Sequence, residues 1–250
     1  MKISISLPSG AYRADLQQAL DISIPLRQGK SVNAFHIDYA RFEPVRVGSF
    51  VGSVAEGGSA NCENLYINAH GNGTHTECVG HISRERISLN DCLKQFMFGA
   101  ELISIRPKTL ENGDGLITLE QIRQALQSKS CEALVIRTLP NSSDKQFRQY
   151  SGNNPAYMEP AAARYIREQG IKHLLLDLPS VDREEDEGLL SAHHAFWNYP
   201  EAPAMDHTIT EMIYVKDEIA DGTYLLQMQI TPIESDASPS KPVLYSLERE

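Results

Sequence analysis

The segment from His70 to His81 contains three of the chain's eight histidines and one glutamate. Imidazole nitrogens and carboxylate oxygens are ligands that Zn²⁺ and Mn²⁺ bind in proteins. If the segment is extended at its centre, His75 and Glu77 point to the same side, because side chains alternate along a strand. Two glycines lie between His70 and His75, and glycine lets the backbone turn tightly around a site. The segment therefore predicts a metal or catalytic site rather than a loop of solvated histidines.

Two further candidate ligands lie in the second half of the chain. His193 is the first of a histidine pair that follows the charged run 183–187. Glu211 is the single carboxylate within the apolar stretch 208–215. A charge in such a strand is costly to bury unless it is paired or binds a metal. Glu211 is therefore either a ligand or a residue on an exposed strand face.

The composition limits the class of protein. With 250 residues, 41% of them hydrophobic and 22% charged, the chain has the makeup of a globular protein, and we expect one domain over residues 1–250. A net charge of −10 and a pI near 5.3 argue against nucleic acid or an anionic membrane as the partner. No apolar run approaches the ~20 residues that span a bilayer, and the first residues lack the apolar core of a signal peptide. We therefore expect a cytoplasmic protein with reduced cysteines.

Strands and helices are expected to alternate between residues 100 and 177, a pattern typical of an α/β fold with parallel or mixed strand pairing. Thr118 and Gln121 have the spacing of a helix-capping box, and Gly170 is placed to end a helix. The strands expected here cover residues 100–105, 133–138 and 171–177, and the helices cover 117–126 and 160–169.

Elements outside this region have weaker patterns. We expect a helix over 12–20, a strand over 21–26, short strands and turns over 28–60, a strand over 64–70, helical spacing over 82–97 and a late strand over 223–230. The tail of about residues 234–250 is rich in serine, proline and charge, and we expect it to be a C-terminal surface extension.

Short motifs along residues 20–215 resemble, in the same order, those of the metal-dependent cyclase-like hydrolases. This family includes bacterial kynurenine formamidase (arylformamidase) and isatin hydrolase, and it carries a His-x-Gly-Thr-His-x-Asp-x-Pro-x-His segment. Here the matches are Gly73-Thr74-His75, Glu77 in place of the aspartate, and His81. The family's first histidine corresponds to position 71, and His70 lies one residue before that position. Further matches are Asp21-Ile22-Ser23-Ile24-Pro25-Leu26, Val135-Ile136-Arg137-Thr138, Asp177-Leu178-Pro179-Ser180-Val181-Asp182, Ser191-Ala192-His193 and Thr210-Glu211-Met212.

The resemblance implies a role for each matching residue. The implied metal ligands are His75, Glu77, His193 and Glu211, and His70 is a further candidate. The implied cofactor is one or two ions of Zn²⁺ or Mn²⁺. His81 matches the family's catalytic acid/base. The family fold is a swivelling β/β/α arrangement of the α/β class with a mixed sheet, and family members are homo-oligomers, often dimers.

The resulting hypothesis is a hydrolase that cleaves the amide C–N bond of a small aryl formamide or cyclic amide. A metal would polarise the carbonyl and activate water, and His81 would transfer a proton to the leaving nitrogen. Thr74, or backbone N–H groups of the glycine-rich turn, would help to hold the oxyanion. Phe196, Trp197 and Tyr199 either contact the substrate or belong to the core.

Two alternatives stay open at this point. The substrate could be a lactam, a lactone or an ester, or the protein could bind a metal or small molecule without turnover. A serine hydrolase is disfavoured because the sequence has no Gly-x-Ser-x-Gly motif. His81 distinguishes the enzyme from a non-catalytic binding protein, because a binding protein does not need a histidine that is not a metal ligand.

Overall fold

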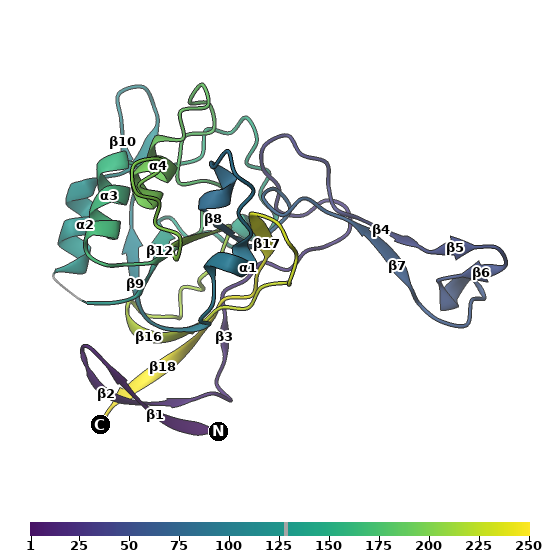
Figure 1. Cartoon of the computed structure of the whole chain (residues 1–250), viewed down its shortest axis with the longest axis horizontal. Coiled ribbons are helices and arrows are strands. Elements are labelled where there is room, and N and C mark those ends of the chain that lie inside the picture. The colour runs from purple at the N-terminus through teal and green to yellow at the C-terminus, as the bar shows by residue number, and fades with distance from the viewer. Residues whose placement is uncertain (128–129) are drawn as a thin grey trace.

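The computed structural model describes residues 1–127 and 130–250 of the chain. Its centre is a mixed β-sheet (Figure 1). The parallel strands at the middle of the sheet are, in spatial order, β9 (Met97–Ile105), β12 (Ala133–Thr138), β14 (His173–Leu176) and β15 (Thr208–Glu211). Every residue of β12, β14 and β15 is buried, as the apolar runs 133–136 and 174–176 predict for strands covered on both faces.

Antiparallel strands extend the sheet on both sides. Beyond β9 lie β16 (Gly222–Gln227), β18 (Val243–Arg249), β2 (Gly10–Asp15) and β1 (Lys2–Leu7), and β3 (Leu20–Asp21) also pairs with β18. Beyond β15 lie β8 (His75–Cys78) and then β17 (Ala237–Pro239). Both ends of the chain and its middle thus meet in one sheet, and the expected single α/β domain with a mixed sheet is confirmed.

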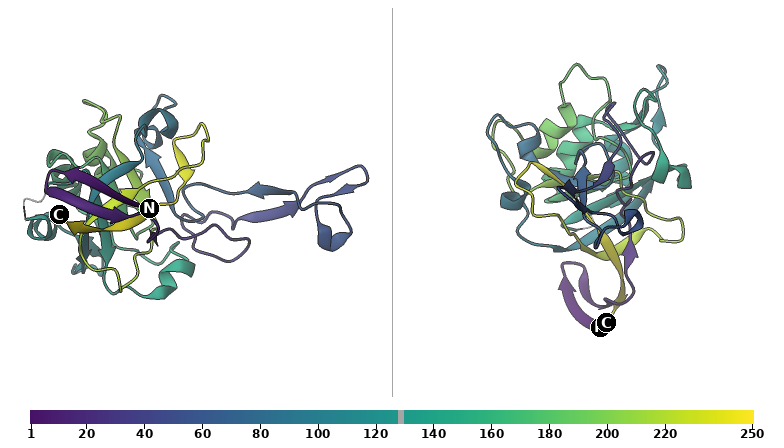
Figure 2. Two further views of the ribbon diagram at one scale, coloured as in Figure 1. Left: turned by 90° about the horizontal axis from the view of Figure 1, so that it is seen from below. Right: turned by 90° about the vertical axis from the view of Figure 1, so that its right-hand side faces the viewer.

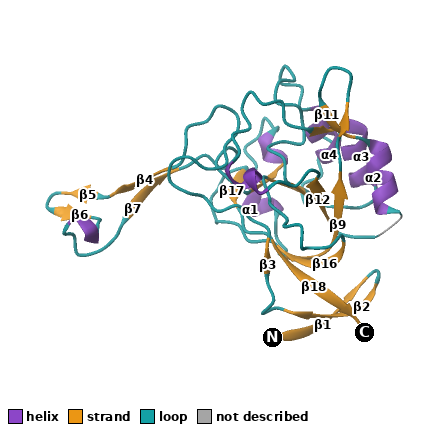
Figure 3. Cartoon of the chain, turned by 180° about the vertical axis from the view of Figure 1, so that it is seen from behind, coloured by secondary structure: helices purple, strands orange, loops and turns teal. Residues whose placement is uncertain are grey.

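Helices cover one face of this sheet (Figure 3). They are α2 (Leu119–Leu126), α3 (Pro160–Glu168) and α4 (Ser191–Trp197). Apolar side chains of these helices pack on alternate residues of β12, β14 and β15 in one buried cluster, which includes Ile122, Leu134, Ile166, Leu174 and Trp197. A second cluster covers the opposite face and includes residues of the short helix α1 (Leu89–Cys92).

The helix starts predicted from local sequence are confirmed. The Thr118 hydroxyl accepts a hydrogen bond from the Gln121 backbone N–H, and the Gln121 side chain accepts one from the Thr118 backbone N–H, so the capping box forms. Helix α3 begins at Pro160, and the chain leaves it through Gly170, which adopts a φ of +81°.

Two of the expected helices are wrong. Residues 12–20 form part of β2 and the turn toward β3, because pairing with β1 and β18 outweighs the local helical pattern. In the stretch 82–97 only α1 is helical. Ser88 caps it, but Leu93 is already extended and β9 begins at Met97.

The C-terminal segment is not a surface extension. Both β17 and β18 belong to the central sheet, and Ala237, Val243 and Leu244 are buried. The apolar run at 243–245 fills a space next to β16 and β3 that local sequence does not reveal.

Smaller elements lie outside the central sheet. They are β10 (Lys108–Thr109) with β11 (Gly115–Ile117) and β13 (Tyr157–Met158), β4 (Arg41–Pro44) with β7 (Glu63–Tyr66), β5 (Arg46–Val47) with β6 (Phe50–Val51), and the 3₁₀ turns η1 (Val54–Glu56), η2 (Val79–His81) and η3 (Ser143–Phe147). Residues 41–66 form an arm that extends away from the rest of the molecule (Figure 2). Within the described ranges, the helices are too short or too polar to span a membrane.

Candidate metal centre

Strands β8 and β15 bring three ligand-type side chains to one face of the sheet. His75 lies opposite Glu211, and Glu77 lies opposite Ile209. Residues opposite each other in a sheet share a face, as do residues two apart on one strand. His75, Glu77 and Glu211 therefore lie together, and each is at most 2% exposed. The strand alternation proposed from the sequence is present, and Glu211 faces the interior rather than solvent.

His193 reaches the same place from helix α4. Its Nε2 lies 3.1 Å from Glu77 Oε1 and 4.0 Å from Glu211 Oε1. Its Nδ1 lies 2.6 Å from Asp182 Oδ2. The Asp182 carboxylate also accepts hydrogen bonds from the backbone N–H groups of Ala192 and His193, so it caps a helix whose own N-cap residue provides no side-chain acceptor. Asp182 thereby turns the free nitrogen of His193 toward the glutamates.

His70 lies in a turn rather than at the end of a strand. The expected strand over 64–70 stops at Tyr66. Asn68 Oδ1 then accepts hydrogen bonds from the backbone N–H groups of His70 and of the next residue, which forms an Asx turn. This turn places His70 Nδ1 3.0 Å from Glu77 Oε2. His70 therefore joins the cluster despite its early position in the motif.

His81 lies in the turn η2, directly after β8. Its Nδ1 is 3.9 Å from Glu77 Oε2. Its ring stacks on that of His70, with 4.4 Å between the ring centroids and 31° between the ring planes. The side chains of His70 and His81 are 22% and 28% exposed, whereas that of Glu77 is 1% exposed. The two histidines therefore form the side of the cluster that solvent and small molecules can reach.

Close contacts between opposite charges set the ionisation of the cluster. Burial opposes the charged forms of His70 and His193, but their carboxylate neighbours outweigh it and raise the pKa of each to about 10. Burial also opposes ionisation of Glu77, but His81, His193 and His70 hold its pKa well below the usual value. Burial, and then the charge of Glu77, raises the pKa of Glu211. A divalent cation bound here would replace the protons of the two imidazolium groups.

One buried nitrogen of the cluster is unpaired. His75 Nδ1 lies 3.0 Å from the Gly73 carbonyl oxygen, so this nitrogen carries the proton and Nε2 presents a lone pair. Among residues 1–127 and 130–250, His75 Nε2 finds no hydrogen-bond partner, although it is buried 3.4 Å from Glu211 Oε2. A lone pair that faces a carboxylate in the interior is costly, and it is the arrangement that a metal ligand needs.

The ligand atoms fall into two overlapping sets. Within the part of the chain that the structure describes, His70, Glu77 and His81 have ligand atoms within 4.8 Å of one another, and so do His75, Glu77 and Glu211. Glu77 belongs to both sets. The nitrogen and carboxylate donors suit Zn²⁺ or Mn²⁺. The residues therefore fit a divalent cation and offer two positions that share the Glu77 carboxylate.

Local sequence patterns do not reveal two aspartates that lie next to the cluster. Asp182 faces the outer nitrogen of His193, and Asp236 Oδ2 lies 2.9 Å from Nε2 of His70. Carboxylates commonly orient metal-binding histidines in this way. Asp182 is the last residue of the Asp-x-Pro-Ser-Val-Asp motif, to which no role was assigned. Asp236 lies in the tail that was expected to be a surface extension.

Replacing Asp182 with alanine is expected to weaken both the helix and the metal centre. The lost cap of α4 costs about 1 kcal/mol of folding free energy, and the unpaired His193 Nδ1–H adds about 1–3 kcal/mol. Metal affinity should fall about 10–100-fold, because His193 loses its orientation. Thermal unfolding and metal titration measure the two effects. Asp182→Asn, which keeps the size of the side chain, should retain more of the stability than Asp182→Ala. Equal metal affinity in wild type and both variants would contradict the role of Asp182.

Thr74 has a structural position. Its hydroxyl accepts a hydrogen bond from the Ile24 backbone N–H and donates one to the Met212 carbonyl oxygen. These bonds tie the start of β8 to two other segments, next to Gly73 with its φ of +148°. The proposed contact between Thr74 and an oxyanion is therefore not supported, because the hydroxyl is already engaged on both sides.

The aromatic residues after His193 belong mainly to the core. Phe196 and Trp197 are fully buried within the cluster beneath the helices, and the Trp197 indole N–H donates to the His207 carbonyl oxygen. They cannot contact a substrate, because helix α4 turns them away from solvent. Tyr199 is half-buried, and its hydroxyl accepts a hydrogen bond from the Arg84 backbone N–H. Of the three, only Tyr199 keeps an accessible surface.

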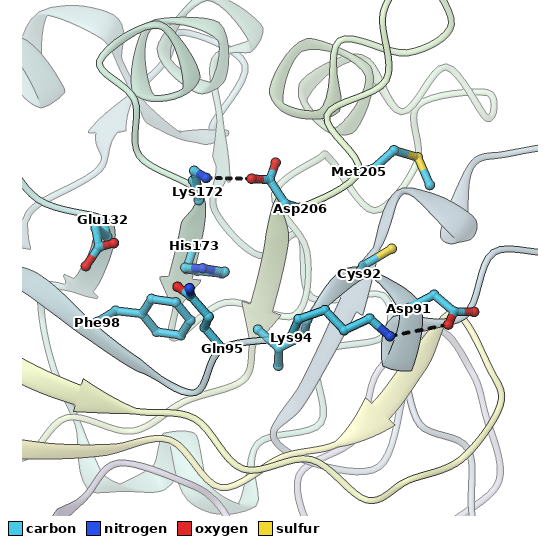
Figure 4. Close-up of a pocket in the computed structure, with 11 residues that line it drawn as sticks. Asp91, Cys92, Lys94, Gln95, Phe98, Glu132, Lys172, His173, Met205 and Asp206 are labelled. Carbon is cyan, nitrogen blue, oxygen red and sulfur yellow. Dashed lines mark hydrogen bonds and ion pairs between the residues drawn. The ribbon is translucent and has the colours of Figure 1, made fainter.

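A separate cavity of about 330 Å³ lies near the amino ends of β9, β12 and β14 (Figure 4). Lys172 pairs with Asp206 and Lys94 with Asp91 along its rim. Burial lowers the pKa of His173 to about 3, so this histidine is neutral. The remaining lining residues are Cys92, Leu93, Gln95, Phe98, Glu132 and Met205. The cavity contains none of the candidate ligands, and Glu211 lies at the opposite, carboxyl end of β15.

Known proteins of similar sequence are kynurenine formamidases. The kynurenine formamidase of Bacillus cereus is 26% identical over 200 residues, which cover 77% of this chain and 83% of the relative. A kynurenine formamidase from another strain of the same species is 23% identical over 236 residues, covering 92% of this chain and 95% of the relative.

Solved structures of similar fold cover nearly the whole chain. Isatin hydrolase A from Ralstonia solanacearum superposes with a TM-score of 0.67 at 13% identity and covers 91% of each chain. A predicted metal-dependent hydrolase from Bacillus stearothermophilus superposes with a TM-score of 0.62 at 17% identity, covering 91% of this chain and 98% of the other. The model of the family described as putative cyclase matches residues 20–183. The chain therefore belongs to the putative cyclase family.

Proposed function

We propose that this protein is a metal-dependent hydrolase that cleaves the amide C–N bond of a small aryl formamide or cyclic amide. The observation that carries the proposal is the buried, unpaired His75 Nε2 among two glutamates and a second buried histidine. Further support comes from the relatives, which are kynurenine formamidases, and from the shared fold with isatin hydrolases.

The proposed ligands are the converging side chains of the cluster. They are His70, His75, Glu77, His193 and Glu211. A histidine and carboxylate set of this kind suits Zn²⁺ or Mn²⁺, and the sharing of Glu77 between two sets of ligand atoms supports one or two ions. Each proposed ligand histidine has an acceptor at its other nitrogen, which fixes the nitrogen that faces the ion.

The bound ion would supply a Lewis acid that polarises the substrate carbonyl and makes water more acidic. The proposed role of His81 follows from its position on the open side of the cluster. It accepts a proton as water adds to the carbonyl carbon, and it returns the proton to the nitrogen as the C–N bond breaks. The products are a carboxylic acid and an amine, which are parts of one molecule when the substrate is a cyclic amide. The partly exposed ring of His81 can reach a substrate that the buried ligands cannot.

A substrate panel tests the proposed reaction class. The metal-loaded protein should hydrolyse N-formylkynurenine or a small cyclic amide such as isatin faster than an ester or lactone of similar size. Hydrolysis confined to the ester and lactone would replace the amide assignment. Metal binding without hydrolysis of any of them would favour a binding protein.

We propose that the protein assembles as a homo-oligomer, at least a dimer, in the cytoplasm. The arm (residues 41–66) supports the assembly, because a two-stranded hairpin away from the core is only marginally stable alone. Its side chains Val47, Val54 and Leu65 are 69%, 53% and 59% exposed. The cytoplasm agrees with Cys62, Cys78 and Cys92, which form no disulfide in the described ranges.

Light scattering tests the assembly. The wild type should have a mass of at least two chains, each of 27.8 kDa. The double change Val47→Glu and Leu65→Glu should shift the protein toward the monomer, because it places charges on an apolar contact. Leu189→Glu is the matched control, since Leu189 is 65% exposed on the body of the molecule. A monomeric wild type, or an arm variant with the wild-type mass, would contradict the proposal.

A further inference from the structure

Asp236 is fixed at the edge of the cluster by its backbone. It directly precedes β17, which pairs with β8. The Asp236 carbonyl oxygen accepts a hydrogen bond of 3.0 Å from the Cys78 backbone N–H, and the preceding Ser235 carbonyl oxygen accepts one of 2.8 Å from the Leu89 N–H. The segment is therefore held between β8 and α1, so the Asp236 side chain cannot easily move away.

The carboxylate of Asp236 faces two histidines. Its Oδ2 lies 2.9 Å from Nε2 of His70 and 3.5 Å from Nδ1 of His81. The side chain is 31% exposed, so it shares the open side of the cluster with both rings. The Ser235 hydroxyl donates to the other carboxylate oxygen at 3.1 Å. The carboxylate thus has partners on both oxygens.

The geometry separates Asp236 from the proposed ligands. His70 faces Glu77 with Nδ1 and Asp236 with Nε2, which are different nitrogens of one ring. An ion held between His70 Nδ1 and Glu77 therefore lies on the other side of the ring from Asp236. Donation from Nε2–H to Asp236 leaves the Nδ1 lone pair directed at Glu77, which is how an outer carboxylate orients a ligand histidine.

The same carboxylate acts on His81. If His81 donates its Nδ1 proton to Asp236, the neutral ring presents its basic lone pair at Nε2. That is the form a general base needs. The 4.4 Å stacking of His81 on His70 keeps the two rings next to one carboxylate.

We infer that Asp236 is a positioning residue that orients both His70, as a metal ligand, and His81, as the acid/base. The inference rests on the proposed function and goes beyond it, because it couples metal binding and proton transfer through one carboxylate. It also gives the C-terminal segment a role in the site.

Variants of Asp236 test the inference in the full-length protein. Asp236→Ala should weaken Zn²⁺ binding, measured by competition with a chelator, about 10–100-fold. It should also lower kcat at saturating Zn²⁺ with N-formylkynurenine as the substrate, because His81 loses its orientation for proton transfer. KM should change less, because Asp236 does not face the ion that would polarise the substrate carbonyl. Asp236→Asn keeps the size and one acceptor oxygen, so it should lie between alanine and wild type in both measurements.

Glu234→Gln is the matched control, because it removes a neighbouring negative charge of the same segment whose side chain does not contact the histidines. It should behave as wild type. If Asp236→Ala does not fold, the Zn²⁺ affinity and kcat of Asp236→Asn test the inference. If Asp236→Asn and Asp236→Ala both keep the Zn²⁺ affinity and the kcat of the wild type, the inference about Asp236 is wrong, but the proposed function is not affected. A wild-type protein that binds neither Zn²⁺ nor Mn²⁺ would overturn both.

Discussion

Replacing Glu77 with glutamine is expected to release the metal and abolish hydrolysis. One carboxylate oxygen of Glu77 lies 3.0 Å from His70 Nδ1 and the other 3.1 Å from His193 Nε2, and both sets of ligand atoms include this residue. Glutamine keeps the size but removes the charge that the cation needs. Because a Lewis acid contributes several kcal/mol to such a reaction, kcat/KM should fall at least about 10³-fold.

Elemental analysis by mass spectrometry measures the metal in Glu77→Gln, and circular dichroism checks its fold. Glu201→Gln, at an exposed position outside the cluster, serves as the control and should keep the metal and the activity. A Glu77→Gln protein that is folded and retains both would show that Glu77 does not bind the cation. The Glu77 carboxylate would then serve only to pair with His70 and His193.

Replacing His81 with alanine is expected to leave the metal in place and remove turnover. His81 lies on the open side of the cluster, and its Nδ1 is 3.9 Å from Glu77, farther than the corresponding nitrogens of His70 and His193. General acid–base catalysis contributes about 10²–10⁴-fold to a rate, so kcat should fall within that range. Metal analysis and steady-state kinetics on the same preparation measure both.

The control for this variant is His36→Asn. His36 lies outside the cluster with a φ of +53°, and asparagine tolerates that backbone conformation. Loss of metal together with activity in His81→Ala would make His81 a ligand, in agreement with its place in the set with His70 and Glu77. Retention of both would show that the proposed proton transfer uses another group.

The parts of the fold that were predicted correctly depend on local physical signals. Strand β12 begins with four apolar residues, Ala133 to Ile136, and such a run is typical of a strand that is buried on both faces. The start of α2 follows from Thr118 and Gln121, whose hydrogen bonds involve only residues three apart. The failures are elements whose partners are distant in sequence. Strands β2 and β18 take their conformation from each other, although more than 200 residues separate them.

The same distinction applies to the candidate site. His75 and Glu77 share a face because of strand alternation, which a short segment reveals. Asp236 reaches His70 across 166 residues, and its surroundings in sequence contain no motif. Trp197 follows His193 by one helical turn, but the direction of α4 buries it, and the sequence does not specify that direction.

Metal content and its link to hydrolysis test the central claim most directly. The measurement is the metal content of the purified protein by mass spectrometry, with hydrolysis of N-formylkynurenine followed before and after treatment with a chelator. We expect one or two ions of Zn²⁺ or Mn²⁺ per chain, loss of hydrolysis on chelation and recovery on addition of the metal. A protein that takes up neither ion after incubation with both, or hydrolysis that chelation does not change, would contradict the account.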